Sequence, residues 1–171
     1  RITIAGLGPM GASLGLALKQ VKLDNTEIVG TDGNRNAVAT AAKMGVVDDS
    51  TRNLRSAMDG AKLVIITVPP TETRDILEAI GPILEQGCVV TDTGTAKAPV
   101  MGWAAQYLPS GVGFVGGHPL PKRLPPSIEE ADPSVFQDID YVVIPAKSAD
   151  GHALRTVTSM VERIGARPLF L

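Results

Sequence analysis

The sequence has a single cysteine, Cys88, among its 171 residues. No disulfide can form within the chain, and because Cys88 begins an apolar run we predict that it is a small buried residue. No apolar run approaches the roughly 18–20 residues of a membrane span. The opening Arg1–Ile4 also lacks the pattern of a signal peptide. We therefore expect a cytoplasmic location and no membrane partner.

Neither sign of charge dominates, since 16 Lys and Arg residues face 18 Asp and Glu residues. Without a basic field, nucleic acid is not an expected partner. A length of 171 residues and a hydrophobic content of 44% suit one folded domain over residues 1–171. The chain opens inside a predicted strand and closes on the apolar Pro168–Leu171. We therefore expect it to be one domain of a longer protein.

Short β-branched runs alternate with helical patterns along the chain. The predicted strands cover 2–5, 27–31, 63–68, 88–91, 112–115, 141–144 and 167–171. The predicted helices cover 10–19, 36–44, 73–84, 99–107 and 151–164. Several strands are apolar at consecutive positions, which is typical of parallel strands buried on both faces. The alternation predicts an α/β fold, namely a doubly wound, mainly parallel Rossmann-type sheet flanked by helices in three layers.

Residues 118–133 interrupt this alternation. The segment contains five prolines and therefore cannot form one long regular element. Loops this long inside compact domains are usually functional or disordered, and its position beyond a predicted strand end favours function.

A glycine-rich turn joins the first predicted strand to the first predicted helix. It reads Gly6, Leu7, Gly8, Pro9, Met10, Gly11 and matches the pattern G-x-G-x-x-G. In this pattern the first glycine allows the tight turn, the second the close approach of a diphosphate, and the third the contact of helix and strand. The helix N-terminus adds free N–H groups and a partial positive charge. We predict that a dinucleotide diphosphate binds at Gly6–Gly11.

Asp32 ends the second predicted strand, about 20 residues beyond the glycine turn, where the partner of the adenosine ribose belongs. A carboxylate there accepts hydrogen bonds from ribose hydroxyls and repels a 2′-phosphate, so NAD is predicted over NADP. Arg35 lies close enough in sequence to soften that preference, or is a solvated residue at a helix start. Val68 and Pro69 end the strand at 63–68 and are expected to shape the wall beside the cofactor.

Two histidines are candidates for proton transfer. His152 begins the predicted helix 151–164 and is expected to face solvent. His118 follows two glycines at a predicted strand end, where the backbone can approach a ligand. Imidazole is the usual proton acceptor near neutral pH. On these residues alone, a catalytic and a structural role for His118 remain equally open.

The stretch Gly116–Pro119 resembles the G-G-H-P motif of the prephenate dehydrogenase family, which includes arogenate dehydrogenases. Three further stretches resemble that family in the same order: Gly6–Leu14 its nucleotide loop, Thr91–Lys97 its D-x-G-S-x-K segment, and Ala131–Phe136 the residues before its next strand. The resemblance spans nearly all of the chain.

The resemblance implies an NAD-dependent oxidoreductase of tyrosine biosynthesis. Its substrate would be a small molecule, either prephenate or arogenate, which is decarboxylated oxidatively to 4-hydroxyphenylpyruvate or tyrosine. His118 matches the histidine that accepts the proton of the ring hydroxyl. Thr95 matches a serine that hydrogen-bonds this hydroxyl, and it is also expected to contact the cofactor. Lys97 matches a lysine expected to support the loop and the site. No metal is implied.

Two departures from the family pattern leave alternatives open. The family continues H-P with a small residue and glycine, whereas here Leu120-Pro121 precede Lys122 and Arg123. These cations either recruit the dicarboxylate substrate or are solvated. The family carries a C-terminal helical domain that forms the homodimer and supplies substrate-binding arginines. We expect this chain to end before that domain and therefore to be incomplete when alone. A β-hydroxyacid dehydrogenase-like or pyrroline-carboxylate reductase-like enzyme, which would lack G-G-H-P, and a non-catalytic redox-sensing module are the alternatives.

Overall fold

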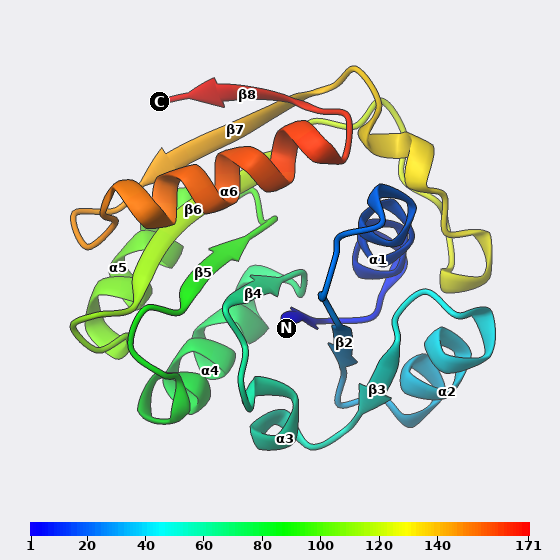
Figure 1. The fold of residues 1–171 in the computed structure, drawn as a ribbon, viewed down its shortest axis with the longest axis horizontal. Helices are drawn as coiled ribbons and strands as arrows, with labels where there is room; N and C mark the ends of the chain where they lie inside the picture. Colours follow the sequence, from blue (N-terminus) through cyan, green and yellow to red (C-terminus); the bar gives the residue numbers. More distant parts are fainter.

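The computed structural model describes residues 1–171, in which eight strands form one sheet in the order β3-β2-β1-β4-β5-β6-β7-β8 (Figure 1). The strands are β1 (Ile2–Ala5), β2 (Ile28–Thr31), β3 (Asp49–Thr51), β4 (Leu63–Ile66), β5 (Val89–Asp92), β6 (Gly113–Pro119), β7 (Asp140–Pro145) and β8 (Arg167–Phe170). The α-helices are α1 (Pro9–Val21), α2 (Arg35–Met44), α3 (Leu54–Met58), α4 (Pro70–Ile80), α5 (Lys97–Tyr107) and α6 (Gly151–Arg163). Three 3-10 turns are η1 (Gly81–Ile83), η2 (Ile128–Glu130) and η3 (Pro133–Phe136).

Every neighbouring pair of strands is parallel except β6 and β7. β1 lies between β2 and β4, so the chain leaves β1 in one direction and later returns to its other side. The carboxyl ends of β1 and β4 therefore flank the point where the strand order reverses, which is where open α/β sheets bind ligands. The predicted doubly wound, mainly parallel sheet is confirmed.

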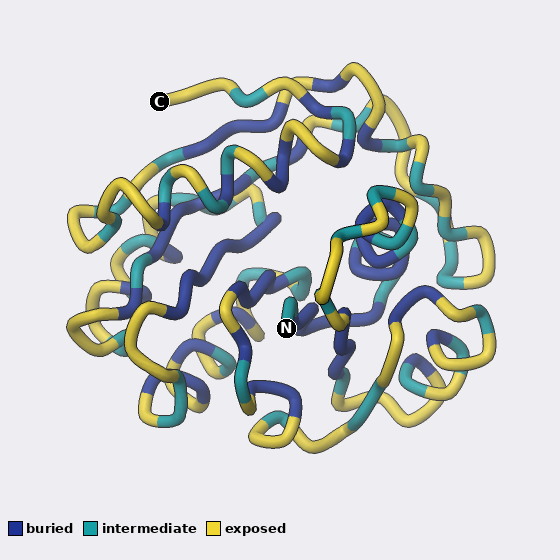
Figure 2. Tube along the Cα trace, viewed as in Figure 1, coloured by how far each residue is buried: buried dark blue, intermediate teal, exposed yellow.

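Helices cover both faces of the sheet (Figure 1). The core on one face takes residues from α1, α2 and α6, and the core on the other takes residues from α3, α4 and α5. All four residues of β4, Leu63–Ile66, are buried because both of their faces are covered, and Figure 2 shows the central strands as the most buried part. Cys88 is buried as predicted, and burial raises the pKa of its thiol to about 11. None of the helices is long and apolar enough to cross a lipid bilayer.

Some elements differ from the sequence-based prediction. β3 and α3 were not predicted, because Asp49–Thr51 is short and polar and α3 is a single short turn of helix capped by Asn53. β6 continues through His118 to Pro119, beyond the predicted end at Val115. The reason is its antiparallel partner β7, which pairs with it as far as Pro119. The G-G-H-P motif therefore lies within a strand and not after one.

The segment between β6 and β7, residues 120–139, is here named the strap. It contains only the short turns η2 and η3, as its prolines predicted. Phe136 and Ile139 are buried in the core, and the backbone N–H of Asp132 donates to Ser13 Oγ of α1 at 3.0 Å. The strap is therefore fixed along α1, beside which Figure 1 draws it in yellow.

Candidate functional site

The glycine turn joins β1 to α1 at the carboxyl edge of the sheet. Gly6 has a φ of 113°, which L side chains rarely adopt, and its N–H donates to the carbonyl of Thr31 at 2.8 Å. A Cβ on Gly11 would collide with the carbonyl oxygen of Gly6, so helix and turn touch there. No heavy atom lies within 4 Å of an ideal Cβ on Gly8. The space over Gly8 at the N-terminus of α1 is thus open to a diphosphate.

A cavity of about 670 Å³ lies over this turn, and we name it the groove. The turns after β1, β2 and β4 form three of its sides and strap residues form the fourth. Of the predicted cofactor residues, those whose atoms line the groove are Gly6, Gly8, Pro9, Asp32, Val68 and Pro69. Leu7 is fully buried, Met10 packs against the core, and Gly11 contacts the turn. Arg35 is exposed at the start of α2 and does not line the groove.

Asp32 ties together the two loops that meet at the groove. One carboxylate oxygen accepts the N–H of Leu7 and the other accepts the N–H of Asn34, both at 2.8 Å. Asn34 in turn caps α2. The carboxylate is thereby held at the end of β2, with its remaining acceptor positions available to a ribose.

A second, smaller cavity of about 310 Å³ adjoins the groove and shares Asp32 with it. Leu54, Val68 and Ile76 give it apolar walls, and Arg52 lines it while its Nε donates to the carbonyl of Gly33 at 3.2 Å. Apolar side chains beside a guanidinium suit a planar heterocycle, and Asp32, Glu72 and Asp75 also line this cavity. Arg52 was missed from the sequence because it follows β3, which was not predicted.

A buried ion pair joins β5 to the G-G-H-P strand. Lys97 Nζ donates to Asp92 Oδ2 and, at 2.5 Å, to the carbonyl oxygen of Gly117. Asp92 also accepts the N–H of Gly94 at 3.0 Å and that of Gly117 at 3.1 Å. The Asp92 side chain is 1% exposed and that of Lys97 15%. Burial raises the pKa of Asp92 and lowers the pKa of Lys97, and each shift is opposed by the partner's charge.

Asp92 was not singled out in the sequence, although it is the first residue of the D-x-G-S-x-K-like segment. Its partner Gly117 lies 25 positions away, and a local pattern does not show that distant contact. The available signal was a carboxylate at the end of an otherwise apolar strand, since such a buried charge requires a partner.

His118 lies at the same edge of the sheet as the glycine turn, because β1, β4, β5 and β6 run parallel. Alternate residues of a strand share a face, so His118 is on the face of Gly116. A Cβ on Gly116 would lie 3.0 Å from Met101 Sδ and 3.5 Å from Lys97 Cδ, which places this face against α5. The Nδ1 atom of His118 is buried and has no hydrogen-bond partner. Thr95 is exposed in the loop before α5.

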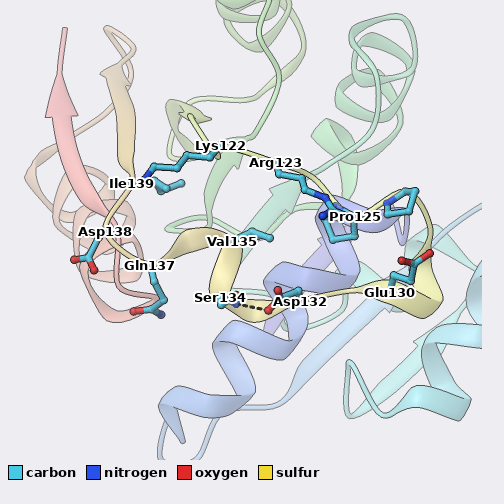
Figure 3. Close-up of a pocket in the computed structure, with 11 residues that line it drawn as sticks. Lys122, Arg123, Pro125, Glu130, Asp132, Ser134, Val135, Gln137, Asp138 and Ile139 are labelled. Carbon is cyan, nitrogen blue, oxygen red and sulfur yellow. Dashed lines mark hydrogen bonds between the residues drawn. The ribbon is translucent and has the colours of Figure 1, made fainter.

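Lys122 and Arg123 line a different cavity, of about 380 Å³, on the strap. Figure 3 shows Lys122 extending toward Ile139. Acidic residues line the same cavity: Glu130, Asp132 and Asp138. The two cations therefore line a cavity that carboxylates also line, and neither of them lines the groove.

The switch-point groove, its glycine turn and the Asp32 carboxylate at the end of β2 define a Rossmann-type nucleotide-binding domain. Residues 14–169 match the family described as prephenate dehydrogenase, nucleotide-binding domain, and the chain belongs to this family. The resemblance read from the four motifs is confirmed.

Relatives and solved structures agree with this assignment. Prephenate dehydrogenase of Bacillus subtilis is 31% identical over 166 residues, which are 96% of this chain and 44% of the relative. Prephenate dehydrogenase from Aquifex aeolicus, solved with hydroxyphenyl propionate and NAD+, superposes with a TM-score of 0.91 at 24% identity, over 99% of this chain and 59% of that one. Arogenate dehydrogenase from Synechocystis has a TM-score of 0.89 at 25% identity and the same two coverages. The chain thus spans less than half the length of the curated relative.

Proposed function

We propose that this chain binds NAD and, within the complete protein, serves the oxidative decarboxylation of prephenate or arogenate. The observation that carries the proposal is the placement of His118 at the same edge of the sheet as the glycine-turn groove. The family assignment supports it, since prephenate dehydrogenase is the activity in the family's description.

The residues of the groove fit a dinucleotide. The open space over Gly8 would receive the diphosphate at the N-terminus of α1, and Asp32 would accept the hydroxyls of the adenosine ribose. The adenine would enter the cavity beside Arg52. A carboxylate at the ribose favours NAD over NADP. Arg35 does not line the groove, so it would not weaken this preference.

The bound nicotinamide supplies a hydride acceptor. His118 would take the proton of the substrate hydroxyl as the hydride leaves the ring carbon that carries this hydroxyl. The ring carboxylate then leaves as carbon dioxide, and its bonding electrons complete the aromatic ring. The exposed hydroxyl of Thr95 would donate to the substrate oxygen, and Lys97 would hold the loop and the strand of His118 together. Lys122 and Arg123 lie on the strap and outside the groove, so they would contact a substrate carboxylate only at the strap.

Residues 1–171 would form the nucleotide-binding domain of a cytoplasmic homodimer. The Bacillus subtilis relative has more than half of its length beyond the match. We propose that an equivalent helical region supplies the dimer contact and further substrate-binding groups.

Two measurements test the proposal. Calorimetric titration of this chain with NAD and with NADP should show tighter binding of NAD. The complete protein should form NADH with prephenate or with arogenate, and comparing the two substrates assigns the activity. Tighter binding of NADP would contradict the cofactor assignment. NAD binding without turnover of either substrate would support the non-catalytic module in place of the enzyme.

A further inference from the structure

The strap supplies one wall of the nucleotide groove, although it is more than a hundred residues away from the glycine turn in sequence. Residues 126–129 line the groove together with Gly33, Asn34 and Ala37 of the ribose end. The turn η2 packs against both α1 and α2. Ile128 is half-buried and packs against the core, which anchors η2 in this position. The neighbouring Glu129 is exposed and is among the residues that line the groove.

The charges of the groove are all of one sign. Fifteen residues line it, and among them Asp32, Glu72 and Glu129 are carboxylates while none is lysine, arginine or histidine. The N-terminus of α1 favours a bound diphosphate. A 2′-phosphate at the ribose would add about two negative charges close to these carboxylates. Like charges at a few ångströms repel each other, and the repulsion is weakened by solvent and salt.

We propose that Glu129 is a second determinant of cofactor choice, which acts with Asp32 to exclude the 2′-phosphate of NADP. Asp32 acts from the β2 edge of the groove, whereas Glu129 acts from the strap that faces α2. The strap follows β6, the strand that contains His118, so this wall of the groove comes from a different part of the chain than the glycine turn. The inference rests on the proposed binding of NAD and adds to it a residue that the G-x-G-x-x-G pattern does not contain.

The test is calorimetric titration of this chain and its variants with NAD and with NADP at low salt. The Glu129→Gln variant is expected to lower the ratio of the NADP Kd to the NAD Kd about 3- to 10-fold, through tighter NADP binding. Glu129→Lys should lower the ratio further. Both effects should shrink in 0.5 M NaCl, where the Debye length is about 4 Å. Thermal unfolding of each variant checks that the fold is retained.

Glu130→Gln is the matched control. Glu130 is the next residue of the same turn and is also exposed, but it lines the strap cavity and not the groove. It removes the same charge from the chain, so its Kd ratio should stay that of the unmodified protein. An unchanged ratio in Glu129→Gln, or an equal change in Glu130→Gln, would overturn the inference. If the unmodified chain instead binds neither nucleotide or prefers NADP, the proposed function itself has failed.

Discussion

Lys97 and Asp92 form an ion pair that also holds the strand of His118. The ammonium of Lys97 reaches the carbonyl of Gly117, and the carboxylate of Asp92 accepts the N–H of the same residue. The N–H and the carbonyl of Gly117 are thus both hydrogen-bonded to this ion pair. A Cβ on Gly117 would meet Thr91 Oγ1 at 3.0 Å and Tyr141 Cε1 at 2.9 Å, so only glycine allows this approach. The pair is therefore placed to position His118 from one residue away.

Removal of Lys97 is expected to destabilise the fold strongly. Lys97→Met leaves the buried Asp92 carboxylate without its counter-charge, which costs about 3–5 kcal/mol. The double variant Lys97→Met with Asp92→Asn should recover part of that loss, because no buried charge remains. Denaturant unfolding measures both. Lys62→Met is the control, since Lys62 pairs with Glu85 at 3.1 Å on the surface and its loss should change stability by less than about 1 kcal/mol.

The loss in Lys97→Met also has a definite pH dependence. Without the ammonium, burial raises the pKa of Asp92 further above its unfolded value, so the folded state binds the proton more tightly. Stability then falls as the pH rises from the unfolded pKa to the folded one, and the variant is least stable above that window. Unfolding at pH 5 and at pH 8 should show the smaller deficit at pH 5. Equal deficits at the two pH values would mean that Asp92 is not the affected group.

Gly8 and Gly11 are expected to respond in opposite ways to the same added methyl group. Gly8→Ala meets no atom of the protein, so it should retain stability but weaken NAD binding about tenfold or more, that is by about 1.4 kcal/mol. Gly11→Ala collides with the turn and should lower stability by about 1–3 kcal/mol. Gly102→Ala, on open space in α5, should leave NAD binding unchanged. Normal NAD affinity in a folded Gly8→Ala variant would remove the diphosphate from this turn.

The sequence predicted the parts of the site that local patterns encode. The glycine turn and Asp32 follow from one strand-turn-helix unit, and the buried strands follow from consecutive apolar positions. Contacts across the sheet could not be predicted in this way, because nothing near Lys97 in the sequence shows that it contacts Gly117. Lys122 was singled out for its charge alone, whereas the path of the strap decides which cavity it lines. Glu129 faces the groove because Ile128 anchors η2, which is a tertiary effect.

The Asp48 carboxylate is expected to stabilise the fold at neutral pH and to lose this contribution at acid pH. Its carboxylate accepts the N–H of Ile28 at 2.8 Å and the ammonium of Lys19 at 2.9 Å, and these contacts lower its pKa, the backbone hydrogen bond most. A lowered folded pKa means that its contribution is present above the unfolded pKa and is lost as the pH falls through the folded one. Asp48→Asn should therefore cost about 1 kcal/mol at pH 7 and less near pH 3, in unfolding experiments. Asp24→Asn, on an exposed loop, should show no such difference.

His118 and His152 are the two histidines of the chain, and their substitution separates chemistry from folding. His118→Asn in the complete protein should lower kcat by about 10²–10⁴, because the proton acceptor for the substrate hydroxyl is lost. NAD binding to the same variant should stay unchanged, since His118 does not line the groove. His152→Asn, which alters an exposed residue of α6, should leave both quantities unchanged. If kcat survives in His118→Asn, another group accepts the proton, and the buried Nδ1 atom of His118 has only a structural role.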